Sequence, residues 1–194
     1  MDYALIDRAV CYVKELFAAN AGGHGADHTL RVYRTAMLLA ESEPACDKTV
    51  IALAALLHDA DDYKLFSTEN NANARRFMAE NGVSAETAER VIRAVNAVSF
   101  SKNGDRHPDT PEGCVVQDAD RLDAIGAVGI GRTFAFGGEH GRSMDETLQH
   151  FYDKLLRLKG LMNTPAAAVI AEERHAFLET FLAQYYKETG EEKP

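Results

Sequence analysis

Hydrophobic residues recur at helical spacing along almost the whole chain. The first such stretch covers residues 3–19 and ends at Asn20-Ala21-Gly22-Gly23, a typical helix stop. The same periodicity and capping signals predict further helices over residues 27–41, 47–60, 68–81, 84–98, 143–159 and 164–188. A polar loop is expected at 101–113, an apolar segment with helical spacing at 114–134, and a glycine-rich stretch at 137–141.

Strand signals are almost absent, since the short Val115-Val116 run continues with helical spacing. The pattern predicts an all-α fold. A length of 194 residues suits one compact domain, and 46 % hydrophobic with 26 % charged residues is an ordinary globular balance. We expect a single domain over 1–187, with C-terminal helices at 143–188 and a frayed tail at 188–194.

Charge and cysteine content narrow the function classes. A formal net charge of −9 disfavours nucleic acid polymers and anionic membranes as partners, so a small anionic substrate would need a local positive site. Three scattered cysteines suit a reducing compartment rather than a disulfide framework. Without a signal-peptide pattern or an apolar run long enough to span a bilayer, the chain is predicted to be soluble and cytoplasmic. The apolar C-terminal helix is compatible with a homodimer.

The first candidate for chemistry is His58-Asp59, at the end of the most apolar predicted helix. An imidazole and a carboxylate there are costly without a compensating partner. The simpler interpretation is that His58 interacts with the last helix carbonyls while Asp59 caps the next segment of the chain.

Two other segments favour a metal site. His28 lies in the first turn of the helix over 27–41, where the helix dipole disfavours a cation and suits the neutral, metal-ligating imidazole. The segment D-A-D-R-L-D places Asp118, Asp120 and Asp123 within an apolar stretch, where clustered carboxylates resist burial unless a cation neutralises them. Two imidazoles and two carboxylates suit one divalent ion among Mn, Co, Ni, Fe, Zn and Mg. Such a site leaves positions for water and a phosphoryl oxygen, as Lewis-acid hydrolysis requires.

These segments together resemble the HD-domain metal-dependent phosphohydrolases, whose pattern is H…HD…D on separate helices of an all-α bundle. The matching pieces are D-H-T-L-R-V-Y-R-T-A, A-A-L-L-H-D-A-D-D and Q-D-A-D-R-L-D-A-I-G, and the likeness covers roughly residues 20–135. The segment V-S-F-S-K-N-G is similar to a subgroup of small bacterial HD proteins, some with nucleotide hydrolase activity. The resemblance implies a single-domain HD-type helical bundle with its metal-site core at about 20–135.

Carried over position by position, the resemblance implies these metal ligands: His28, His58, Asp59 and Asp120. The register of A-D-R-L favours Asp120 over Asp118. Because two positions on a helix are about 200° apart, both cannot readily bind one ion. Asp118 or Asp123 would then orient a ligand from behind.

The resemblance also indicates residues around the metal. Asp59 and Asp62 are the catalytic candidates. Asp62 stands where many relatives carry an acid that positions water or protonates the leaving group, and Asp61 competes for that role. Independently of the resemblance, Arg31, Lys64 and Lys102 are candidates for holding phosphate. Arg31 lies about one helical turn from His28 and so faces the same way, and Lys102 lies in the predicted loop segment S-F-S-K-N-G. The alternative for each of them is a merely solvated basic side chain.

The chain departs from the subgroup just before its first ligand. The subgroup has a histidine followed by an acidic and an aromatic residue, whereas this chain has His24-Gly25-Ala26. The departure concerns substrate contacts rather than the metal.

The predicted function is a metal-dependent phosphohydrolase acting on a small phosphorylated metabolite, with a nucleotide as the expected substrate. Cleavage of a phosphomonoester and of a pyrophosphate both fit. The alternative is a metal-binding regulatory or sensor module without catalysis. A metal-free helical interaction protein and a two-iron oxygenase fit the sequence less well.

Overall fold

The structure is a computed structural model and describes residues 1–18, 25–63 and 65–190. Regular secondary structure in these residues is entirely helical, which confirms the predicted all-α class. The chain divides into two compact units, Met1–Asp120 and Arg121–Pro194, with the division inside a helix. The domain limits of 1–187 stay a prediction. Within the described ranges, no helix has both the length and the apolar character needed to cross a membrane.

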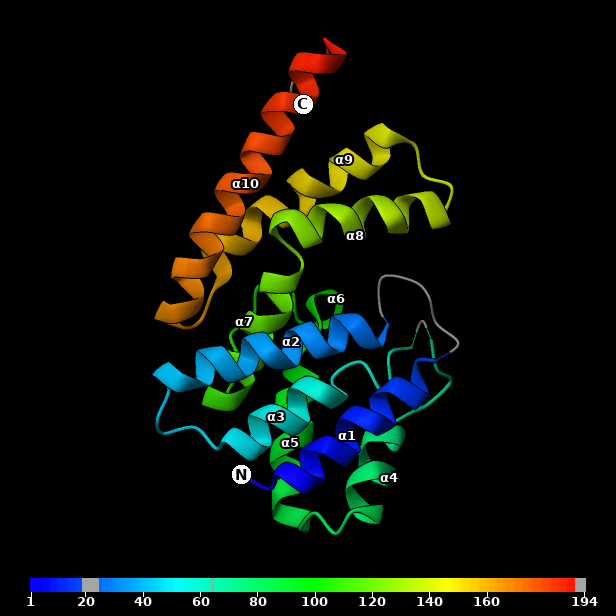
Figure 1. Cartoon of the computed structure of the whole chain (residues 1–194), viewed down its shortest axis with the longest axis vertical. Helices are drawn as coiled ribbons and strands as arrows, with labels where there is room; N and C mark the ends of the chain where they lie inside the picture. The colour runs from blue at the N-terminus through cyan, green and yellow to red at the C-terminus, as the bar shows by residue number, and fades with distance from the viewer. Residues whose placement is uncertain (19–24, 64, 191–194) are drawn as a thin grey trace. The chain divides into compact units, whose positions relative to one another are not determined.

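The first unit is built around one buried helix, α3. Its elements in chain order are α1 (Tyr3–Leu16), α2 (Ala26–Leu39), η1 (Ala40–Ser42), α3 (Lys48–Leu57), α4 (Ala72–Glu80), α5 (Ala85–Val98), α6 (Phe100–Asn103) and α7 (Pro111–Asp123), the last crossing into the second unit. Helix α3 packs against α1, α2 and α5 (Figure 1). It thus forms the centre of the unit that carries the predicted metal site.

The central place of α3 follows from its sequence. Asp47 caps its N-terminus by accepting hydrogen bonds from the backbone N–H groups of Thr49 and Val50. Every residue from Val50 to Leu57 is buried. A helix that is apolar all round is stable only when neighbours cover every face, and here three helices do so.

The apolar segment predicted at 114–134 is not one helix. It divides into α7 and α8 (Gly126–Glu139), because Gly126 adopts a left-handed φ of 76° that a helix interior does not allow. Gly129 is also required, since a Cβ there would collide with the carbonyl of Ala124. The predicted loop at 101–113 also differs, because residues 101–103 belong to the short helix α6 and α7 already begins at Pro111.

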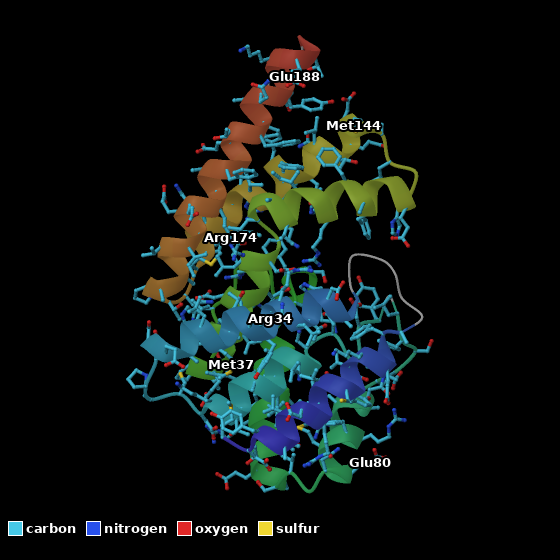
Figure 2. The ribbon with its side chains drawn as sticks, in the orientation of Figure 1. Arg34, Met37, Glu80, Met144, Arg174 and Glu188 are labelled. Atoms are coloured by element: carbon cyan, nitrogen blue, oxygen red, sulfur yellow. The ribbon has the colours of Figure 1, made fainter. Side chains whose placement is uncertain are left out.

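The second unit contains α8, α9 (Met144–Asp153), η2 (Leu155–Leu161) and α10 (Pro165–Thr189). The helix predicted over 143–159 ends early, at Asp153, and continues as the tighter η2. Helix α10 packs against α8 and η2. Its Arg174, labelled in Figure 2, donates from Nη1 to the carbonyl of Leu122 at 2.6 Å, which satisfies an acceptor near the end of α7.

Candidate metal centre

Three helices of the first unit bring the four predicted ligands together. His28 comes from the first turn of α2, where its backbone N–H bonds to the carbonyl of Gly25. His58 is the C-cap of α3, and Asp59 follows it. Asp120 lies on α7. Residues up to 92 positions apart in the sequence therefore meet at one point.

The ligand atoms of these residues face one another. The Nε2 atoms of His28 and His58 are 3.3 Å apart. Asp59 Oδ2 lies 3.5 and 3.4 Å from those two nitrogens, respectively. Asp120 Oδ1 lies 3.4 Å from the His28 nitrogen and 3.9 Å from that of His58. Both carboxylates therefore flank the same pair of imidazole nitrogens.

These separations match those of atoms around one small cation. Ligands about 2.0–2.2 Å from an ion stand about 3.0 Å apart at neighbouring corners of an octahedron and about 3.4 Å apart in a tetrahedron. The donor atoms of His28, His58 and Asp120 all lie within 4.8 Å of one another. Two imidazole nitrogens in van der Waals contact repel through their lone pairs unless a proton or a cation lies between them. The donor set therefore fits a divalent metal ion.

The orientation of His58 leaves one ring nitrogen for this cluster. Its Nδ1 lies 2.8 Å from the carbonyl oxygen of Ala55, one helical turn earlier. A carbonyl accepts only, so Nδ1 carries the hydrogen and donates it. In the neutral ring, Nε2 then has its lone pair free for a metal. The contact with a helix carbonyl that the simpler interpretation expects is thus present at Nδ1, and the ligand role of Nε2 stays a prediction.

The charges of the cluster are strongly coupled. Burial disfavours the charged form of His58, but the carboxylates of Asp59 and Asp120 outweigh it and raise its pKa to about 9. Burial also acts against the ionised form of Asp120, and the hydrogen bond and charge from His28, with the charge of His58, lower its pKa nonetheless. The two carboxylates thus favour positive charge at the imidazoles, as they would favour a cation at this point.

One side of the cluster is open. The side chains of both histidines are 2 % exposed, whereas those of Asp59 and Asp120 are 16 % and 25 % exposed. The imidazoles of His28 and His58 thus form the buried side of the cluster, and the carboxylates of Asp59 and Asp120 form its solvent-exposed rim. This arrangement leaves room for water or a substrate oxygen, as a catalytic metal site requires.

The other two aspartates of D-A-D-R-L-D lie in different surroundings. Asp118 is fully buried. Asp123 forms a 2.6 Å ion pair with Arg132 inside the second unit. The suggestion that either one orients a ligand stays a prediction, and the ion pair gives Asp123 a structural role in addition.

Asp61 and Asp62, the two competing candidates for a catalytic acid, differ in their contacts. Asp61 accepts hydrogen bonds from the backbone N–H groups of Asn73 and Ala74 at 2.9 and 3.0 Å, in the first turn of α4. It therefore acts as the cap of that helix, a role that Asn71 at the N-cap position does not fill. Asp62 is half-buried, and its backbone closes a tight turn onto the carbonyl of Asp59.

The predicted phosphate contacts are only partly described. Arg31 lies on α2 and is half-buried, three residues after His28. Lys102 lies on α6 with its ammonium 6.0 Å from the ring centre of Tyr63. Lys64 and His24 lie outside the described residues. All of these remain predictions as substrate contacts.

Two residues near the cluster are absent from the sequence-based candidates. Gln117 is buried on α7, and its amide donates to the carbonyls of Ala97 and Arg106 at 2.8 and 3.2 Å. Tyr63 is 62 % exposed and pairs with Lys102. Position is the one signal that could have found them: Gln117 precedes Asp120 by one helical turn, and Tyr63 follows the His58-Asp59 pair by four residues.

Comparison with known proteins places this geometry in a family. The HD domain family matches residues 25–125. The protein YpgQ of Bacillus subtilis is 41 % identical over 185 residues, which cover 91 % of this chain and 90 % of YpgQ. A protein of Acanthamoeba polyphaga mimivirus, L803, is 33 % identical over 128 residues, 58 % of this chain and 53 % of L803.

Solved structures agree over nearly the full length. The crystal structure of Bacillus subtilis YpgQ in complex with ADP superposes with a TM-score of 0.81 at 39 % identity, covering 94 % of this chain and 97 % of YpgQ. An HD-superfamily hydrolase from Bacillus thuringiensis gives a TM-score of 0.81 at 38 % identity, covering 99 % and 100 %. The chain therefore belongs to the HD-domain family and is a metal-dependent hydrolase of the HD superfamily.

Proposed function

We propose that the protein is a phosphohydrolase that uses one divalent metal ion to cleave a small phosphorylated metabolite, and that this metabolite is a nucleotide. The observation that carries the proposal is the pair of imidazole nitrogens of His28 and His58, 3.3 Å apart, with a carboxylate oxygen of Asp59 and one of Asp120 each 3.4–3.9 Å from these nitrogens. These residues would hold a divalent ion, which would supply Lewis-acid chemistry by lowering the pKa of water and polarising a phosphoryl oxygen.

The surrounding side chains have complementary roles in this proposal. Asp59, on the open rim, helps to orient the attacking water. Asp62 accepts the proton that the attacking water releases and passes it to the leaving oxygen, since Asp61 is occupied as the cap of α4. Arg31 and Lys102 neutralise phosphate oxygens, which the net charge of −9 would otherwise repel.

Support for a nucleotide substrate comes from one relative. YpgQ of Bacillus subtilis has been crystallised with ADP and is 39 % identical to this chain. Conserved architecture over 94 % of the chain makes a ligand of the same class the natural first candidate. Whether phosphate or pyrophosphate leaves is a question for product analysis.

The test is metal analysis of the purified protein, followed by a nucleotide and phosphoester panel with Mn²⁺, Co²⁺, Ni²⁺ and Mg²⁺. We expect one bound ion per chain and release of phosphate or pyrophosphate from at least one nucleotide. His58→Ala and Asp120→Ala should lose both metal and activity. Asp109→Asn, a nearly isosteric change at an exposed carboxylate of the same unit, is the matched control and should keep both.

Three results would count against the proposal. A protein that binds no divalent ion has no such centre. A protein that binds metal and shows nucleotide-induced thermal shifts, yet hydrolyses nothing in the panel, is the regulatory or sensor module instead. Loss of metal in Asp118→Asn with retention in Asp120→Ala would move the fourth ligand to Asp118.

A further inference from the structure

An aromatic side chain lies close to the metal cluster along the chain and is exposed to solvent. Tyr63 follows Asp59 by four residues, and the backbone between them is a tight turn, with the N–H of Asp62 bonded to the carbonyl of Asp59 at 3.1 Å. Asp59 and Asp62, the ends of this turn, are under about 7 Å apart, and Tyr63 is the next residue, so its backbone lies within about 11 Å of Asp59 on the open rim of the cluster. Its side chain is 62 % exposed, so the ring is not part of the core.

A second segment meets Tyr63 from a different part of the unit. Lys102 belongs to α6, nearly forty residues further along, and its ammonium lies 6.0 Å from the centre of the Tyr63 ring. A cation at this distance is attracted by the π electrons of the ring. The contact places a positive charge and a flat aromatic surface side by side.

The α6 segment is itself tied to the helix of Asp120. The buried amide of Gln117 holds the carbonyls of Ala97 and Arg106, on either side of α6. Gln117 is three residues before Asp120, so the anchor is one turn from a candidate ligand. Asn103 reinforces the segment by donating to the carbonyl of Asn96 at 2.9 Å. Tyr63 thus lies shortly after the C-terminal end of α3, and Lys102 lies on a segment that is hydrogen-bonded to α7, so both are connected to helices that supply the cluster.

We infer that Tyr63 is the stacking platform for the base of a nucleotide ligand, with Lys102 beside it on the side of the phosphate chain. The inference deepens the proposed function and rests on it in taking a nucleotide as the ligand. Every nucleobase has a π face, so a tyrosine ring binds bases without selecting strongly among them. The ammonium of Lys102 next to the ring would pair with the phosphate chain, which extends from the nucleoside toward the metal.

The experiment separates the base from the phosphates. Binding of α,β-methylene-ADP and of methylenediphosphonate, which share a bridge that resists cleavage but differ in the nucleoside, is measured by calorimetry on the Mn²⁺-loaded protein. Tyr63→Ala should weaken binding of the nucleotide analogue about 5- to 150-fold, the range that stacking on one aromatic ring provides. Binding of methylenediphosphonate should be unchanged. Tyr63→Phe keeps the ring and should bind both as the wild type does.

The control is Tyr3→Ala, which removes another exposed tyrosine, 71 % accessible, from the same unit and should change neither affinity. An unchanged affinity of Tyr63→Ala for the nucleotide analogue overturns the inference, as does an equal loss for both ligands, which would mean that Tyr63 holds the loop. Failure of the proposed function looks different. If the wild type binds the nucleotide analogue through Tyr63 but hydrolyses no nucleotide, the proposed hydrolysis of nucleotides is refuted, whereas the base-stacking role of Tyr63 is retained.

Discussion

Replacing Asp61 by alanine should destabilise the protein while leaving its metal centre loaded. Asp61 accepts from the N–H groups of Asn73 and Ala74, the second and third residues of α4, which an N-cap residue normally satisfies. Loss of an N-cap acceptor costs about 0.5–2 kcal/mol. Because two donors lose a charged acceptor that is half-buried, we expect the upper half, about 1–2 kcal/mol.

For a chain of this length, that loss corresponds to a fall of about 2–8 °C in the thermal unfolding midpoint. Calorimetry or circular dichroism measures the midpoint, and activity is assayed well below it. Asp61→Asn should recover only part of the loss, because each carboxylate oxygen accepts from a different N–H group and asparagine keeps only one of these two acceptors. Asp62→Ala should do the opposite, losing hydrolysis with little change in the midpoint.

The reasoning would be refuted by an Asp61→Ala protein with an unchanged midpoint and no activity. Such a result would make Asp61 the catalytic acid and its contacts with α4 incidental. Loss of bound metal in this variant would show instead that the cap holds Asp59 in place. Metal content is therefore measured on the same samples.

Two further predictions concern protons and charges. The pKa of His58 is raised to about 9 in the metal-free cluster, so a metal ion must displace its proton, and the apparent metal affinity should rise about tenfold per pH unit up to about pH 9 and then level off. Competition with a metal-sensitive dye measures this affinity. An affinity that does not change with pH would contradict the ligand role of His58. Arg90 joins Asp47 and Glu112 at 3.0 and 2.7 Å, at the N-terminal ends of α3 and α7. Glu112 is only 11 % exposed, so Arg90→Met should lower the free energy of unfolding in urea by about 1 kcal/mol at low salt. The loss should be smaller at 1 M salt because salt screens the ion pair. Equal losses at low and high salt would exclude an electrostatic cause.

Local signals predicted most helices well. Asp47 and Ser84 are of residue types that favour the N-cap, and the structure shows each side chain accepting from the helix it precedes. The helix predicted at 68–81 begins only at Ala72, because its cap comes from Asp61, eleven residues before the helix. When the capping side chain comes from the far side of a loop, no residue next to the helix start signals the cap, so the sequence pattern does not locate the first residue of the helix.

The break between α7 and α8 was hidden for a related reason. Apolar spacing continues through Gly126, and periodicity carries no information about the backbone angle of a single residue. Glycines inside a helical pattern permit a turn without requiring one. Packing in the second unit decides the matter, since the side chain of Arg174 lies where a Cβ on Gly126 would be crowded.

The sequence by itself determined the fold class and the types of ligand. Helical periodicity depends only on neighbouring residues, and imidazoles and carboxylates placed against apolar surroundings already indicate a cation. The tertiary structure decided which of those groups meet. It turned Asp120 toward the histidines, buried Asp118, assigned Asp61 to α4, and set Tyr63 beside Lys102. These pairings join residues up to 92 positions apart, and only the packing of helices fixes separations of that kind.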